Sequence, residues 1–203
     1  MNIKKTLKKE EFNRKRNIII SILVMIIMAY LVTVLTNNQV LTGFDSYFSF
    51  FYVIVVDFLL LINITSVISE EKISFNINED KLRIDGGYLG TRYVLPLNKI
   101  VYVDVHTIDQ KDFNVIIITK KAHRKKYKDI NPYFIKKNPH YNSTFDYIKE
   151  NYGEDERFSY IEIKKSGSRK YYLLFVLYKT TYNIGFSKNA IEYIKRFTKE
   201  YNL

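Results

Sequence analysis

The sequence predicts two N-terminal transmembrane α-helices followed by an α+β domain, an antiparallel β-sandwich or barrel of about seven strands capped by a C-terminal helix. Three observations lead to this class. Two long apolar runs, residues 18–36 and 47–68, contain no Lys or Arg. Short segments after residue 70 alternate apolar and polar side chains, which is the period of a half-buried strand. Residues 187–203 place their apolar side chains on one face of a helix.

Each apolar run is close to the roughly 20 residues that a helix needs to cross the hydrocarbon core of a bilayer. A helix is the only single segment that satisfies its own backbone hydrogen bonds in lipid. A buried soluble helix is one alternative, but two such runs would need a larger core than the remaining chain can build. A cleaved signal peptide is another, but the first run is too long and no small-residue cleavage site follows it before Asn37. We therefore expect a two-span hairpin over residues 17–68.

Charge sets the expected orientation of this hairpin. The leader, residues 1–16, carries seven Lys and Arg side chains, whereas the connection at 37–46 carries none. Because basic segments stay on the cytoplasmic side, the leader and, after two spans, residues 69–203 are expected in the cytoplasm. The sequence thus predicts a multi-pass protein of the cell membrane with both termini cytoplasmic. The leader itself is expected to lie at the bilayer surface as an amphipathic or disordered segment.

Asp57 is the one acid inside the two apolar runs. A charge within the bilayer is costly, so an intramembrane acid is a candidate functional group. The alternative is structural, because a protonated Asp57 that hydrogen-bonds Tyr30, Thr33 or Asn63 would pin the two helices together. A single acid without a second charge in either run does not indicate a transport pathway.

Residues 69–203 are expected to form one domain of short consecutive strands. Ile73, Phe75 and Ile77 alternate with polar residues, and a turn at 78–81 leads into a second strand, as in a β-hairpin. The strands are expected at 73–77, 82–85, 100–105, 115–118, 160–164, 171–178 and 181–186.

The stretch 120–157 interrupts this rhythm and is too long for a hairpin loop, so it is expected to be an insertion. Within it, residues 143–153 have the pattern of a short helix that Ser143 caps and Gly153 ends. The last segment opens with Ser187 as N-cap, and we expect its apolar face to pack on the sheet.

Three motifs resemble a known family. They are the strand Lys81-Leu82-Arg83-Ile84, the glycine-marked turn Gly86-Gly87-Tyr88-Leu89-Gly90-Thr91-Arg92, and the segment Val94-Leu95-Pro96-Leu97-Asn98-Lys99-Ile100-Val101-Tyr102-Val103. In this order they are similar to the bacterial pleckstrin-homology-like (PH-like) membrane protein family, over roughly residues 70–119 and 158–203. The resemblance implies a PH-like domain behind paired spans. It implies little about function, since a fold does not fix a ligand, although some members are associated with bacteriocin resistance.

The sequence carries no pattern of catalytic or metal-binding residues. Cys is absent, and His106, His123 and His140 are widely spaced without neighbouring pairs of carboxylates. Gly86-Gly87 lacks the Lys of a phosphate-binding loop. We therefore expect neither an enzyme nor a bound cofactor.

The most concentrated signal in the domain is a basic cluster between residues 120 and 128. It consists of Lys120, Lys121, Arg124, Lys125, Lys126 and Lys128. In a chain of formal net charge +11, this cluster predicts contact with the anionic lipid headgroups of the bilayer. A solvated loop is the alternative, and an acidic protein is the second candidate partner. Nucleic acid ranks last, because no nucleic-acid-binding motif accompanies the charge.

Together these features predict a membrane-anchored, PH-like binding or scaffolding module on the cytoplasmic face of a bacterial membrane, with a protein partner besides the lipid bilayer. The alternative is a membrane defence factor of the bacteriocin-resistance type, or a transport accessory protein, in which the spans act and the domain regulates.

Overall fold

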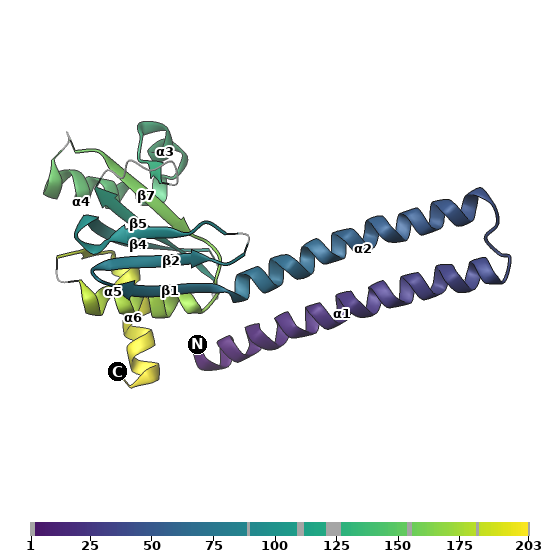
Figure 1. The fold of residues 1–203 in the computed structure, drawn as a ribbon. Coiled ribbons are helices and arrows are strands. Elements are labelled where there is room, and N and C mark those ends of the chain that lie inside the picture. The colour runs from purple at the N-terminus through teal and green to yellow at the C-terminus, as the bar shows by residue number, and fades with distance from the viewer. Residues whose placement is uncertain are drawn as a thin grey trace.

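The computed structural model of the 203-residue chain describes residues 3–88, 90–108, 112–120, 127–153, 156–181 and 183–202. A long helical hairpin projects from one end of a mixed α/β domain (Figure 1). The hairpin consists of α1 (Ile3–Asn37) and α2 (Phe44–Glu71), which run antiparallel, and the hydroxyl oxygens of Thr36 and Ser46 lie 3.2 Å apart near its tip. Both helices are long and apolar enough to cross a membrane, as the sequence predicts.

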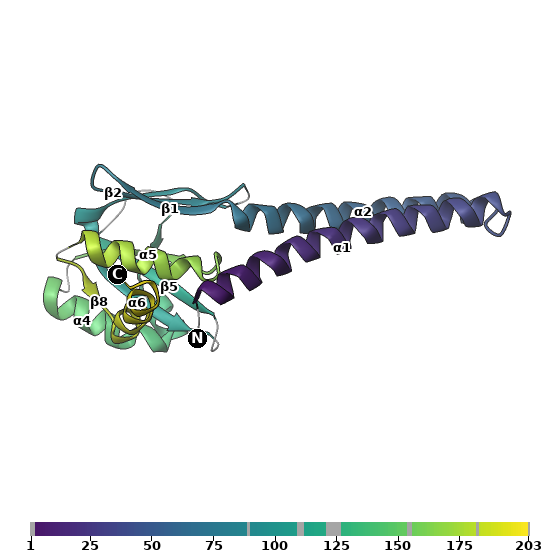
Figure 2. The same ribbon diagram turned by 90° about the horizontal axis from the view of Figure 1, so that it is seen from below.

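In its described residues, 3–16, the leader is helical, so the disordered alternative is wrong. It is the first part of α1, and its beginning packs on the domain beside α6 (Lys188–Tyr201) (Figure 2). Ile3 is 1% exposed, and its backbone N–H donates to Glu200 Oε2 at 2.6 Å. The N–H of Lys4 donates to Glu200 Oε1 at 2.7 Å. Because the first N–H groups of a helix lack intrahelical acceptors, this carboxylate caps α1.

A small antiparallel sheet follows α2 directly. It contains β1 (Ile73–Asn78), β2 (Lys81–Gly86) and β3 (Tyr93–Pro96) in that order, and Asn78 pairs with Lys81 across a two-residue turn. The turn residues Glu79 and Asp80 have positive φ, as such tight hairpins require. At the other end, Gly87 lies against α2, and an added Cβ would stand 2.0 Å from the carbonyl oxygen of Ser69.

A second sheet is joined to the first through the short 3₁₀ helix η1 (Leu97–Lys99). Its strands are β4 (Ile100–Thr107), β5 (Phe113–Lys120), β6 (Lys128–Asp129), β7 (Phe158–Ile163) and β8 (Gly185–Phe186), in the order β6-β7-β5-β4-β8. The two sheets are separate and open in the described residues, so the closed barrel is not formed. The short β8 pairs parallel with β4, which departs from the antiparallel prediction.

One face of the second sheet is covered by α5 (Arg169–Thr180) and α6, which enclose the main core. The strand expected at 171–178 is therefore wrong, because this segment is the helix α5. Its fully buried apolar residues, Leu173, Leu174 and Leu177, recur at three- and four-residue spacing on the face that meets the core. In α6, Ser187 is the N-cap as predicted, and its hydroxyl oxygen accepts from the N–H of Ala190 at 3.1 Å.

The opposite face of the second sheet is covered by the 120–157 stretch. It folds into α3 (Pro132–Lys137), the 3₁₀ helix η2 (Pro139–Tyr141) and α4 (Asn142–Tyr152), which enclose a smaller second core. The helix expected at 143–153 is confirmed, but its N-cap is Tyr141 and not Ser143. Thr144 Oγ1 donates to Oδ2 of the buried Asp104 at 2.5 Å, and this bond ties α4 to β4.

Candidate binding groove at the end of the domain

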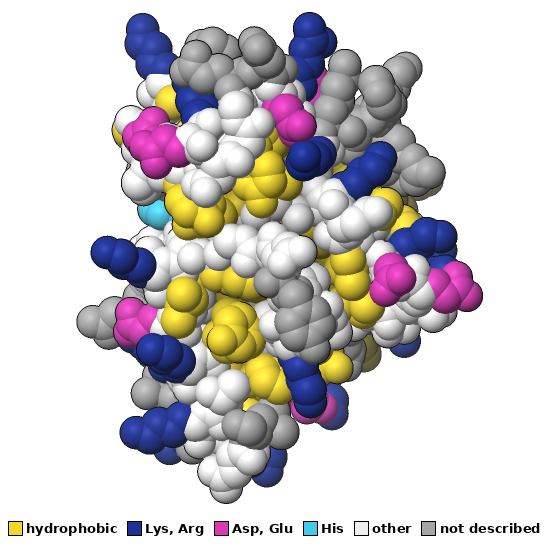
Figure 3. Space-filling model, turned by 90° about the vertical axis from the view of Figure 1, so that its left-hand side faces the viewer, with side chains coloured by type: hydrophobic (Ala, Val, Ile, Leu, Met, Phe, Trp, Pro, Cys, Tyr) yellow, Lys and Arg dark blue, Asp and Glu magenta, His cyan; other side chains and the backbone are white. Residues whose placement is uncertain are grey.

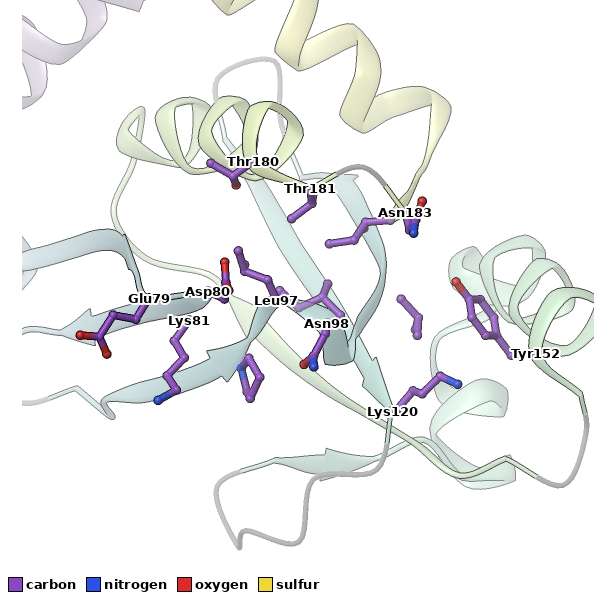
Figure 4. A pocket seen from close by; sticks show the side chains of 14 residues that line it. Glu79, Asp80, Lys81, Leu97, Asn98, Lys120, Tyr152, Thr180, Thr181 and Asn183 are labelled. Atoms are coloured by element: carbon purple, nitrogen blue, oxygen red, sulfur yellow. The ribbon is translucent and has the colours of Figure 1, made fainter.

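A groove of about 640 Å³ opens at the end of the domain that is farthest from α2 (Figure 4). We call it the distal groove. It is lined by Glu79, Asp80, Lys81, Pro96, Leu97, Asn98, Ile100, Val101, Lys120, Tyr152, Thr180, Thr181, Asn183 and Ile184. Figure 3 views the domain from this end, where exposed apolar side chains lie between Lys and Arg side chains. The groove is therefore an amphipathic surface and not a sealed cavity.

Local structure fixes each wall of the distal groove. The β1–β2 turn forms one wall, and it is held by the N–H of Leu97, which donates to the carbonyl oxygen of Asp80 at 2.8 Å. The end of α5 forms another wall, where Thr180 Oγ1 donates to Val176 O at 2.7 Å. The start of β4 supplies an apolar floor, which includes the buried Ile100 and Val101. Such a preformed wall-and-floor arrangement is suited to binding.

Lys120 stands on the far wall of the distal groove. Its Nζ lies 3.2 Å from Glu156 Oε1 and 5.3 Å from the centre of the Tyr152 ring, so the ammonium group is oriented by both contacts. Figure 4 shows Lys120 directed toward Tyr152. Lys81, on the opposite wall, is exposed. The groove thus has a base on each side of its apolar floor.

Of the basic cluster, the structure describes Lys120 and Lys128, whereas Lys121, Arg124, Lys125 and Lys126 lie outside the described residues. Lys120 pairs with Phe158 at the start of β7, while Lys165 beyond the end of β7 forms an ion pair with Glu70 of α2 at 3.1 Å. Lys120 is thus separated from the α2 end by the length of β7, about 16 Å at 3.3 Å per strand residue. This separation between Lys120 and the end of α2 exceeds the Debye length of about 8 Å at physiological salt, beyond which exposed charges are largely screened from each other.

Asp57 lies on α2 within the hairpin, and its Oδ1 is buried without a hydrogen-bond partner. The partners that the sequence suggested do not bond this atom. Thr33 Oγ1 donates instead to Ala29 O of its own helix at 2.8 Å, and Tyr30 is largely exposed. The structure therefore does not show the hydrogen bond that would make Asp57 a pin between the helices.

The described residues contain no group of three or more His, Asp and Glu side chains placed to hold a metal ion. His106 lies on β4 beside Tyr141, with ring centres 6.0 Å apart; His123 lies outside the described residues, as does the side chain of His140.

Burial, reinforced by Asp104, raises the pKa of Tyr102 to about 12, so its phenol stays neutral.

The distal groove was not predicted, because its walls come from segments more than 100 residues apart. Of its lining residues, only Lys120 was predicted as a binding residue, because of its charge. Comparisons with protein-family models, with curated proteins and with solved structures find no match for this chain.

Proposed function

We propose that this protein is a membrane-anchored, non-enzymatic binding module that holds an acidic segment of another protein in the distal groove. The observation that carries the proposal is the groove itself, an open, preformed apolar floor with Lys81 beside Glu79 and Asp80 on one wall and Lys120, paired with Glu156, on the other. Bases on both sides of an apolar surface favour a partner whose acidic residues flank apolar ones.

The location of the groove supports a tethered adaptor. With the hairpin in a cell membrane and both termini cytoplasmic, the distal groove faces the cytoplasm, away from the bilayer. We further propose that the domain is PH-like, on the motifs at 81–103 and on the C-terminal helix that packs over the sheet.

Photo-crosslinking in native membranes tests the groove. A photo-reactive amino acid at Asn98, which is exposed and lines the groove, should capture an acidic protein. The same amino acid at Asn142, exposed at the start of α4 and outside the groove, should not. Lys81→Glu should abolish the capture at Asn98, whereas Arg83→Glu, exposed on the same strand but outside the groove, should leave it unchanged. Equal capture from both positions would refute the proposal.

Anionic-lipid contact by the six bases stays a prediction with its own test. The full chain in nanodiscs should bind added vesicles that contain anionic lipid and should not bind neutral vesicles, because each base near such a surface contributes about 1 kcal/mol. Added salt should weaken the binding, and replacement of the six bases by Gln should remove it. Unchanged binding by the Gln variant would show that the cluster is a solvated loop.

The second candidate function, a defence or transport accessory factor, is favoured by one observation, the buried Oδ1 of Asp57 that has no hydrogen-bond partner. In that case the spans act and the domain regulates. Asp57→Asn, which keeps the size of the side chain, would then abolish the membrane phenotype while capture at Asn98 continued. If the protein is instead a binding module, Asp57→Asn should retain both the membrane phenotype and the capture at Asn98.

A further inference from the structure

Strand β1 has a free edge. Within the described chain it pairs only with β2, on one side. Arg169 Nη1 donates to the carbonyl oxygen of Ile73 at 3.2 Å, so this carbonyl points away from β2. Because the pairing pattern of antiparallel strands repeats every second residue, the N–H and C=O groups of Phe75 and Ile77 point to the same free side. An unpaired edge of this kind can accept another strand.

An apolar groove of about 430 Å³ lies beside this edge, on the side of the domain where α1, α5 and α6 meet (Figure 2). Its lining is mostly apolar and includes Leu7, Phe75, Tyr172, Phe197 and Tyr201. Tyr172 is 51% exposed, so its ring is available to a partner. We call this the β1 groove; it shares no lining residue with the distal groove.

The described rim of the β1 groove is basic. Lys4 Nζ stands 4.6 Å from the centre of the Tyr201 ring, Arg169 lines the groove, and the exposed Lys72 precedes β1. Two nearby carboxylates are already bonded. Glu200 accepts from the first N–H groups of α1, and Glu10 accepts from Ser168 N at 3.2 Å and Ser168 Oγ at 2.8 Å. These hydrogen bonds orient the two carboxylates without removing their charge, so the three bases exceed them by one and the net positive charge of these groups attracts acidic groups.

We propose that the β1 edge binds an extended segment of a partner protein as an added strand. Apolar side chains at every second position of this segment enter the β1 groove between Phe75 and Tyr172, and acidic side chains flank them at the basic rim. A lipid lacks the alternating N–H and C=O groups that pair with Phe75 and Ile77. A second copy of β1 fits poorly, since Ile73–Asn78 contains no acid. This site is independent of the distal groove.

Peptide binding to the full chain in neutral nanodiscs tests the proposal. The probe is an acetylated seven-residue peptide in which Glu and Val alternate, and its control carries N-methyl groups on alternate amides, which removes strand pairing and keeps the charge. The probe should bind, and the N-methylated peptide should bind at least about 10-fold more weakly, a loss of about 1.4 kcal/mol. A seven-residue peptide in which Lys replaces Glu should not bind.

A matched pair of substitutions on α5 locates the site. Tyr172→Glu places a carboxylate in the β1 groove and should weaken probe binding at least about 10-fold. Tyr178→Glu, at 55% exposure on the same helix but outside the groove, should have no effect. Equal binding of the N-methylated peptide, equal effects of the two substitutions, or no binding up to about 1 mM would overturn the proposal. So would a dimer of the chain that Tyr172→Glu dissociates, because a second copy would then be the occupant.

Discussion

Lys170 is a base with no exposed side-chain surface at the start of α5. Its Nζ lies 2.7 Å from Asp112 Oδ1, donates to Lys164 O at 2.9 Å, and stands 5.0 Å from the centre of the Phe113 ring. A buried ammonium group is stable only when its charge is compensated, so this pair fixes the start of α5 against the start of β5. It is a structural ion pair, because both partners are committed to each other.

Removing one partner of this pair should be costly. Asp112→Asn leaves the Lys170 charge without its carboxylate. The free energy of unfolding should fall by somewhat less than about 3 kcal/mol, because solvent partly screens the half-exposed Asp112. Chemical denaturation in detergent measures the change. The double variant Asp112→Asn with Lys170→Met removes both charges and should recover much of the loss. A double variant less stable than Asp112→Asn alone would contradict this account.

Tyr171 should make the stability of the fold depend on pH at alkaline pH. Burial, reinforced by Tyr193, raises the pKa of Tyr171 to about 12, from 10.0. Below pH 10 its phenol is neutral in both folded and unfolded chains, so it contributes no slope. Between pH 10 and 12 the unfolded chain ionises first, and stability should fall by roughly 2 kcal/mol. Unfolding measured at pH 9 to 12 should show this loss, and Tyr171→Phe should reduce it; an identical profile for the variant would contradict the assignment.

Among the helices and strands, the sequence pattern predicted an element correctly where a segment fits only one period, that of a strand or that of a helix. The β1–β2 hairpin, the helix at 142–152 and the Ser187 cap of α6 were all predicted. Residues 171–178 were not, because a short, continuous apolar run rich in aromatic residues fits a buried strand and a buried helix equally well. Packing against α6 and the sheet decides for the helix, and sequence alone does not contain that contact.

The contact between the start of α1 and α6 can be tested through Glu200. Glu200→Gln keeps the shape of the cap but removes its charge, so the hydrogen bonds to Ile3 and Lys4 weaken by about 1 kcal/mol. Hydrogen exchange of the first amides of α1 should then accelerate roughly 5-fold. Glu192→Gln, which affects an exposed ion pair within α6, is the control and should leave these amides unchanged. Equal acceleration in both variants would show that Glu200 is not the cap.

For the whole molecule, composition and charge predicted the paired apolar helices and the domain behind them. They did not predict that two sheets stay open, because closure depends on which strand edges meet, and the parallel β8 and the helix α5 occupy positions that strands were expected to fill. Both grooves arise in the same way. Each is lined by segments that are distant in sequence, so its residues have no shared local pattern.

Single-cysteine labelling tests most directly whether a membrane hairpin presents this domain to the cytoplasm, since the chain has no native Cys. Asn38→Cys lies at the tip of the hairpin and Asn98→Cys at the distal groove, and both side chains are exposed. A membrane-impermeant thiol reagent on intact cells should label Asn38→Cys, and should label Asn98→Cys only after the membrane is permeabilised. Labelling of Asn98→Cys on intact cells, with Asn38→Cys protected, would contradict the account.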